Sequence, residues 1–142
     1  MEEIKKMLEV YSRNVSALAN APIALNNVAL LKGNSTQLQG VSTIQLNKCG
    51  VYEISVSAVA TAETAGQISI QLEKDDVLQP QAYSAVTAAD TTSVHPLGFT
   101  TLVQVTHNNN TNCVCATPTN IDIINTGEAA TFNSIKVTVI RI

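Results

Sequence analysis

Residues 48–76 read KCGVYEISVSAVATAETAGQISIQLEKDD, and this stretch decides the fold. Side chains of a β-strand point alternately to two faces, so a half-buried strand carries apolar residues at every second position. After Gly50, one face carries Tyr52, Ile54, Val56 and Ala58. The same alternation returns at Ile68, Ile70 and Leu72, beyond a turn at Ala65-Gly66. The stretch therefore predicts two antiparallel strands, with Tyr52, Ile54 and Val56 in the core.

Similar runs continue along the chain after residue 20. We expect strands over residues 23–31, 36–39, 42–46, 51–60, 67–74, 77–86, 92–105, 111–116, 120–126 and 134–142. Turn-forming Gly, Asn and Asp residues separate these runs, for example at Gly33-Asn34 and Asp75-Asp76. Many short strands with regular turns predict a mainly β protein, an antiparallel sandwich of the jelly-roll kind.

The composition limits the classes of partner. The chain has 142 residues, which fit one domain, with 13% charged and 4% aromatic residues and no Trp. A net charge of −3, with no Lys/Arg cluster beyond Lys5-Lys6, argues against the dense basic face that nucleic-acid binding requires. No run approaches the roughly 18 apolar residues that span a membrane. The charged N-terminus lacks the apolar centre of a signal peptide, so we expect a chain made in the cytoplasm without membrane insertion.

Residues 2–19 show a different spacing. Apolar residues recur at intervals of 4, 3, 4 and 3 at Ile4, Leu8, Tyr11, Val15 and Leu18. This is the seam of a helical bundle, and Pro22 ends the segment because the residue before a proline avoids helical geometry. We therefore predict a helix over residues 1–20 that trimerises or docks, and a head domain over residues 21–142. A single amphipathic helix packed on its own domain has the same stripe and stays open as an alternative.

The cysteines are a candidate metal site. Cys113 and Cys115 lie on one face of a predicted strand, and His107 is close in sequence. A zinc site needs two further ligands, and Cys-x-Cys without a second pair lacks the usual spacing. Free cysteine also behaves as a small buried apolar side chain, so we predict no metal. Cys49 has no visible partner, and three cysteines do not form an even disulfide framework.

Catalytic chemistry has no motif in the sequence. No nucleophile elbow, His-Glu-x-x-His motif or phosphate-binding Gly-rich loop is present. Asp75 and Asp76 are compatible with calcium, but aspartates at this position are typical of a hairpin turn. We therefore predict a protein that is not an enzyme and that binds no cofactor.

Two polar loops are candidate ligand-binding regions. They read TAADTTS over residues 87–93 and HNNNTN over residues 107–112. Loops on a rigid β scaffold often carry binding groups, so Asp90 and Asn109 are the candidate residues for a sugar or protein surface. Ordinary solvated turns are the competing interpretation.

Four segments together resemble a known superfamily. They are NKCGVY at residues 47–52, GQISIQL at residues 66–72, IDIINTG at residues 121–127 and SIKVTVIRI at residues 134–142. Over residues 23–142, their order resembles the tumour-necrosis-factor-like superfamily, which includes the complement-type globular heads. Vertebrate members carry more aromatic residues where this chain has Ile54 and Val56, so the resemblance favours the microbial and phage branch. It implies a compact homotrimer, with one sheet of each jelly roll packed around a three-fold axis.

The resemblance also sets the expected function. It implies a structural or attachment component of a surface assembly, most specifically a phage virion head fibre, decoration or short fibre protein. The N-terminal segment is expected to contact a capsid or other virion protein, and the head to project from the virion surface. The alternative is a ligand-binding adhesin or carbohydrate-binding head on a cell or spore surface. The strand pattern and the seam alone permit two-fold as well as three-fold association.

Overall fold

The computed structural model describes residues 6–106 and 114–142, with residues 114–117 described by their backbone only. The described residues form eleven strands: β1 (Lys6–Ala17), β2 (Ala21–Pro22), β3 (Asn27–Lys32), β4 (Thr36–Gln39), β5 (Thr43–Lys48), β6 (Gly50–Ala62), β7 (Gly66–Lys74), β8 (Val77–Ala88), β9 (Val94–Val105), β10 (Val114–Asn125) and β11 (Ala130–Arg141). None of these residues lies in a helix, so no helix able to cross a membrane occurs in the described part.

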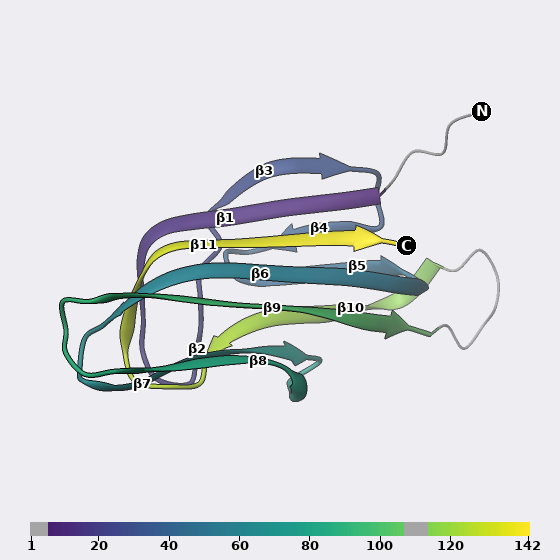
Figure 1. Cartoon of the computed structure of the whole chain (residues 1–142). Coiled ribbons are helices and arrows are strands. Elements are labelled where there is room, and N and C mark those ends of the chain that lie inside the picture. The colour runs from purple at the N-terminus through teal and green to yellow at the C-terminus, as the bar shows by residue number, and fades with distance from the viewer. Residues whose placement is uncertain (1–5, 107–113) are drawn as a thin grey trace.

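The strands form two antiparallel sheets that pack face to face (Figure 1). One sheet has the order β3-β1-β11-β6-β9, which places both ends of the described chain at its centre. The other has the order β4-β5-β10-β7-β8, and the short β2 pairs with the end of β10. Strands from opposite ends of the sequence lie side by side, as in a jelly roll. The predicted mainly β antiparallel sandwich is confirmed.

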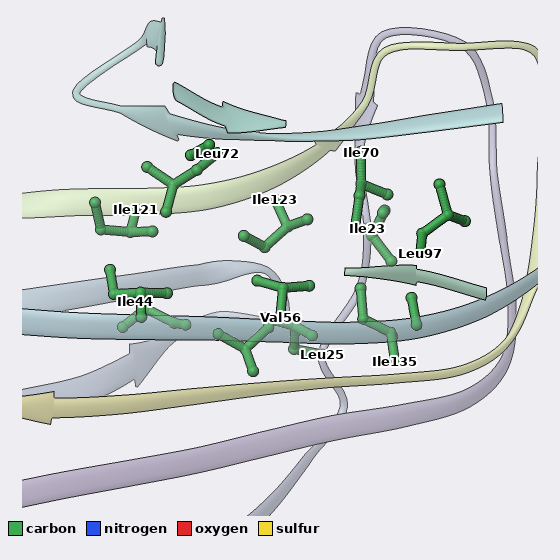
Figure 2. Packing of buried hydrophobic residues seen from close by; sticks show 14 of the residues in the cluster. Ile23, Leu25, Ile44, Val56, Ile70, Leu72, Leu97, Ile121, Ile123 and Ile135 are labelled. Atoms are coloured by element: carbon green, nitrogen blue, oxygen red, sulfur yellow. The ribbon is translucent and has the colours of Figure 1, made fainter. Parts of the chain in front are cut away.

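The core fills the space between the two sheets. Figure 2 shows Ile70, Leu72, Ile121 and Ile123 of one sheet near Val56 and Ile135 of the other. Ile23 and Leu25, from the segment between β2 and β3, are also fully buried within this layer. Burying a side chain of this kind contributes about 1.5–3 kcal/mol, so this layer is the main source of stability.

Strand β6 shows how the sequence pattern produces this core. Tyr52, Ile54 and Val56 are 0%, 0% and 4% exposed, because β6 lies inside its sheet between β11 and β9. The hydroxyl of Tyr52 donates a hydrogen bond to the Lys48 carbonyl oxygen at 2.7 Å. The one polar atom of this large side chain is therefore paired, as a buried phenol requires.

The predicted N-terminal helix is wrong over the described residues 6–17. These residues form β1, which is hydrogen-bonded to β11 on one side and to β3 on the other. Leu8, Val10 and Ser12 alternate into the core, which is the period of a strand. Asn14 then has a φ of 54°, and this irregularity shifts the alternation so that apolar residues also fall at helical intervals. Tertiary pairing along two edges outweighs the local helical pattern.

The predicted strand boundaries differ from the structure mainly in two places. The two strands expected over residues 111–116 and 120–126 are one strand, β10, from residue 114 onward. Its register breaks between Val114 and Thr119, where Pro118 lacks an amide donor. The run expected over residues 23–31 forms a strand only from Asn27. Before it, Ile23 and Leu25 point into the core from a connecting segment, where the Ile23 amide donates to the Ile123 carbonyl oxygen at 2.8 Å.

The turn between β7 and β8 confirms its predicted chemistry. Asp75 and Asp76 have φ angles of 48° and 68°, a pair of left-handed conformations that a two-residue hairpin turn requires. The Asp75 carboxylate accepts a hydrogen bond from the Asn120 amide at 2.8 Å. The two aspartates therefore serve the turn geometry.

Candidate functional site

The five-stranded sheet has one broad surface that faces away from the core, and the pairing of its strands identifies the residues on that surface. Directly opposed residues of neighbouring strands share a face, so its side chains form rows across the sheet. We call the following residues the outer face: Met7, Glu9, Tyr11, Glu53, Ser55, Ser57, Gly98, Thr100, Leu102, Lys136, Thr138 and Ile140. They come from β1, β6, β9 and β11, so this surface depends on the whole sheet being assembled.

The middle row of the outer face carries polar side chains, most of them small: Glu9, Thr138, Ser55 and Thr100. The hydroxyls of Ser55 and Thr100 lie 3.2 Å apart, and Thr138 donates to the Glu9 carboxylate at 3.2 Å. In the next row, at Gly98, an added Cβ would lie 2.8 Å from the Val56 carbonyl oxygen, so the backbone permits no side chain there. Small and mutually bonded side chains leave a surface that another rigid surface can approach closely.

Apolar and charged side chains flank this row. Leu102 is 59% exposed on β9, and Tyr11 is 37% exposed on β1. Glu53 on one side supplies negative charge and Lys136 on the other supplies positive charge, and Glu9 adds a second carboxylate within the row itself. The outer face therefore combines exposed apolar side chains with charges of both signs.

The structure places the five predicted trimerisation or docking residues in different environments. Leu8 is fully buried in the core, Val15 is half-buried and packs against it, and Tyr11 lies on the outer face. Leu18 follows β1 and is 72% exposed, and Ile4 lies outside the described residues. The seam is therefore not one surface, although a role of Tyr11 or Leu18 in assembly stays a prediction.

The predicted ligand-binding residue Asp90 lies in the turn between β8 and β9. One carboxylate oxygen accepts hydrogen bonds from the Ser93 and Thr92 amides at 2.8 and 3.0 Å. The other oxygen accepts from the Ser93 hydroxyl at 3.1 Å. These bonds, first those from Ser93 and Thr92 amides, lower the pKa of Asp90 to about 2. Its geometry is that of a turn residue, and a ligand role stays a prediction; Asn109 lies outside the described residues.

The cysteines depart from the sequence analysis at one position. Cys49 is disulfide-bonded, so the reading of Cys49 as a cysteine without a partner is wrong. Cys113 and His107 lie outside the described residues, as does the side chain of Cys115. Among the side chains that are described, no three His, Cys, Asp or Glu residues come together as a metal site.

Carboxylates gather on the exposed face of the six-stranded sheet. Asp122 of β10 lies opposite Glu73 of β7, close to the turn that carries Asp76. Burial raises the pKa of Asp122, and the Asp76 carboxylate adds to this effect, although Thr43 donates a hydrogen bond at 2.8 Å. Burial also raises the pKa of Glu73, and Asp122 and Asp76 raise it further. Glu73 and Asp122 are therefore two partly buried carboxylates on this sheet, with the exposed Asp76 beside them.

Several residues of the outer face went unrecognised in the sequence. Leu102 and Ile140 lie in strands where the neighbouring apolar residues alternate into the core, so a single sequence does not distinguish them from core residues.

The exposed apolar residues of β3 were predicted only as part of a strand. A cue did exist, because residues 27–32 read NVALLK, a strand with apolar residues on both faces.

Comparison with known proteins identifies the fold. No protein-family model matches the chain, and no curated protein matches it in sequence. More than a hundred solved chains match the structure, among them the following three. Murine APRIL at pH 5.0 has a TM-score of 0.69 at 7% identity, over 98% of this chain and 100% of its own.

The other two come from different organisms. The Eiger TNF from S. frugiperda has a TM-score of 0.68 at 11% identity, over 96% of this chain and 93% of its own. The PRD1 vertex protein P5, a phage protein, has a TM-score of 0.63 at 17% identity, over 99% of both chains. The chain therefore has the TNF-like jelly-roll fold, which TNF-family proteins share with a phage vertex protein.

Proposed function

We propose that this chain is a structural or attachment component of a surface assembly, most specifically a phage virion protein. Such a protein would be a head fibre, a decoration protein or a short fibre protein. The observation that carries the proposal is the match to the PRD1 vertex protein over 99% of both chains. The TNF-like neighbours support a binding or structural role in preference to an enzymatic one.

We further propose that the chain acts as a homotrimer. The resemblance to the TNF-like superfamily implies three jelly rolls around a three-fold axis, with one sheet of each facing that axis. The outer face supports the choice of the five-stranded sheet, because it combines bare backbone at Gly98 with exposed Leu102 and Tyr11. Burying these groups between copies would remove apolar surface from water and so stabilise the trimer.

A substitution on the outer face tests the trimer. Ser57 is exposed on this face between Lys136 and Gly98, so Ser57→Arg should place one large cation from each chain in the proposed interface. Thr87→Arg, exposed on β8 of the other sheet, is the matched control. Sedimentation velocity should show trimers for the wild type and Thr87→Arg and mainly monomers for Ser57→Arg. Trimers of unchanged stability for Ser57→Arg would contradict the proposed interface.

Fractionation separates the virion role from the alternative of an adhesin on a cell or spore surface. Particles released by cells that carry this sequence are purified on a density gradient, and their proteins are identified by mass spectrometry. The virion proposal expects the chain in the particle fraction. Recovery only in the cell or spore envelope, with glycan binding that Asp90→Ala or Asn109→Ala abolishes, would favour the alternative.

A further inference from the structure

Strand β3 carries core-facing apolar side chains that the core does not cover. Val28 lies opposite Val10 of β1, and Leu31 lies opposite Leu8, so both point to the inner side of the sheet. Val10 and Leu8 are fully buried, whereas Val28 and Leu31 are 51% and 50% exposed. Apolar side chains with the orientation of core residues are thus left in contact with water.

The other sheet offers a matching edge. Strand β4 is the edge strand of the six-stranded sheet, and Leu38 points inward from it but is only partly buried. Beside it, the hydroxyls of Ser35 and Thr36 are buried without a hydrogen-bond partner within the described part of the chain. Buried hydroxyls are normally paired, so this margin between β3 and β4 is incomplete in apolar cover and in hydrogen bonding.

The backbone of β3 is also available. β3 ends the strand order of its sheet, and among the described strands only β1 pairs with it (Figure 1). All six of its residues are exposed, and none is a proline. An edge of this kind presents unpaired amide and carbonyl groups to any extended chain that approaches.

The positive charge at the C-terminal end of β3 indicates which charge a partner should carry at the end that lies beside it. Lys32 is the last residue of β3, and the aliphatic chain of Lys6 lies against the neighbouring Gly33. Two cations therefore flank the C-terminal end of the strand. A segment that pairs antiparallel to β3 begins at this end, so an acidic residue at its start would be complementary.

We propose that the free edge of β3 binds an extended segment of a partner polypeptide as an added antiparallel strand. Alternate apolar side chains of this segment cover Val28, Leu31 and Leu38, and an acidic residue at its start lies beside Lys32. Strand addition of this type takes affinity from main-chain hydrogen bonds and selectivity from alternate side chains. The sequence predicts docking through an N-terminal helix, but residues 6–17 form strand β1. The free edge of β3 provides a docking contact in its place.

This docking contact is separate from the proposed trimer. It uses the inner side and the free edge of β3, whereas the trimer uses the outer face around Ser57. The two proposals are therefore tested by different variants and different readouts. Failure of one leaves the other standing.

Peptide binding to the full chain tests the proposal. The probe is a short fluorescent peptide that begins with two glutamates and then alternates valine with threonine. Fluorescence anisotropy should show micromolar binding to the wild type, and Val28→Thr with Leu31→Thr should weaken it about tenfold or more. Val77→Thr, a similarly exposed residue on β8 of the other sheet, is the matched control and should bind as the wild type does.

Three further measurements identify the mode of binding. Probes N-methylated at all valines or at all threonines test the pairing. The probe whose methylated amides face β3 should lose binding, because these amides cannot donate to the β3 carbonyl oxygens, and the other probe should keep it. Lys32→Glu should weaken the glutamate-led probe about threefold or more and strengthen a lysine-led one. Amide exchange of β3 should slow when the glutamate-led probe is bound.

Three results would overturn the proposal. One is no binding of the glutamate-led probe by a wild-type chain that is folded by circular dichroism. Another is binding that the Val28 and Leu31 substitutions leave unchanged. The last is a loss of oligomer mass caused by these substitutions, since it would identify a second copy of the chain as the occupant of β3.

Discussion

Strands β6 and β3 belong to the same sheet and both carry inward-pointing apolar residues, yet their surroundings are opposite. Ile54 of β6 is fully buried, whereas Leu31 of β3 is half exposed. The difference comes from position, because β6 is paired on both sides and β3 is an edge strand. Alternation therefore determines which way a side chain points, and the place of the strand in the sheet determines what covers it.

The largest difference between the two strands should appear on truncation of a core side chain. Ile54→Ala should lower the free energy of unfolding by about 2–5 kcal/mol, because it opens a cavity in a layer that cannot collapse fully. Val28→Ala should lower it by less than about 1 kcal/mol, because half of that side chain is already in water. Urea denaturation of both variants measures the two values. Equal losses would contradict the contrast between β6 and β3.

The disulfide at Cys49 sharpens the same comparison, because it lies directly before the buried strand β6. Cys49→Ser should lower the free energy of unfolding by about 2–4 kcal/mol, since the unfolded chain regains the freedom that the bond removes. Differential scanning calorimetry with and without reductant measures this effect. Reductant should lower the melting temperature of the wild type and leave Cys49→Ser unchanged. A wild type insensitive to reductant would show that the bond does not stabilise the fold.

Buried polar groups give a smaller contrast. Asn125 is fully buried, donates hydrogen bonds to the Ala17 and Glu128 carbonyl oxygens at 3.0 Å, and accepts one from the Gly127 amide. Asn125→Ala should lower the free energy of unfolding by about 1–3 kcal/mol, because its partners stay buried and unpaired. Thr36→Val should be neutral or stabilising, because the Thr36 hydroxyl has no partner in the described part of the chain. A destabilising Thr36→Val would show that this hydroxyl is paired.

The smallest expected effect is the pH dependence at Asp122. Its pKa is raised by burial, so the folded state binds a proton more tightly than the unfolded state. This contribution is fully present below 3.8, the ordinary pKa of an aspartate, and is lost as the pH rises through the raised pKa of the folded state. The stability of Asp122→Asn relative to the wild type should therefore increase from pH 3 to pH 6. Urea titrations across this range measure the difference in stability between the two proteins. A decrease of this difference with pH would mean that folding lowers the pKa of Asp122.

Local alternation was sufficient to predict most of the sandwich. The strand at residues 36–39 and the turn at Asp75-Asp76 follow directly from side-chain period and turn chemistry. The segment at residues 6–17 was predicted wrongly, because its pairing partners, β11 and β3, decide its conformation and only one of them is near in sequence. An irregularity at Asn14 also gave the strand a helical spacing.

The candidate surfaces were less predictable than the fold. Leu102 and Leu31 look like core residues in the sequence, and only the sheet order shows that one faces outward and the other lies at an edge. The disulfide at Cys49 depends on residues brought together by the fold, which spacing alone does not specify. Strand order and assembly are long-range properties, so a single sequence contains little local signal for them.

The solution mass of the full chain, measured by light scattering coupled to size-exclusion chromatography, tests the central claim most directly. We expect the mass of three chains at micromolar concentration. The mass of a single chain under the same conditions would contradict the trimer and the assembly role proposed for the outer face.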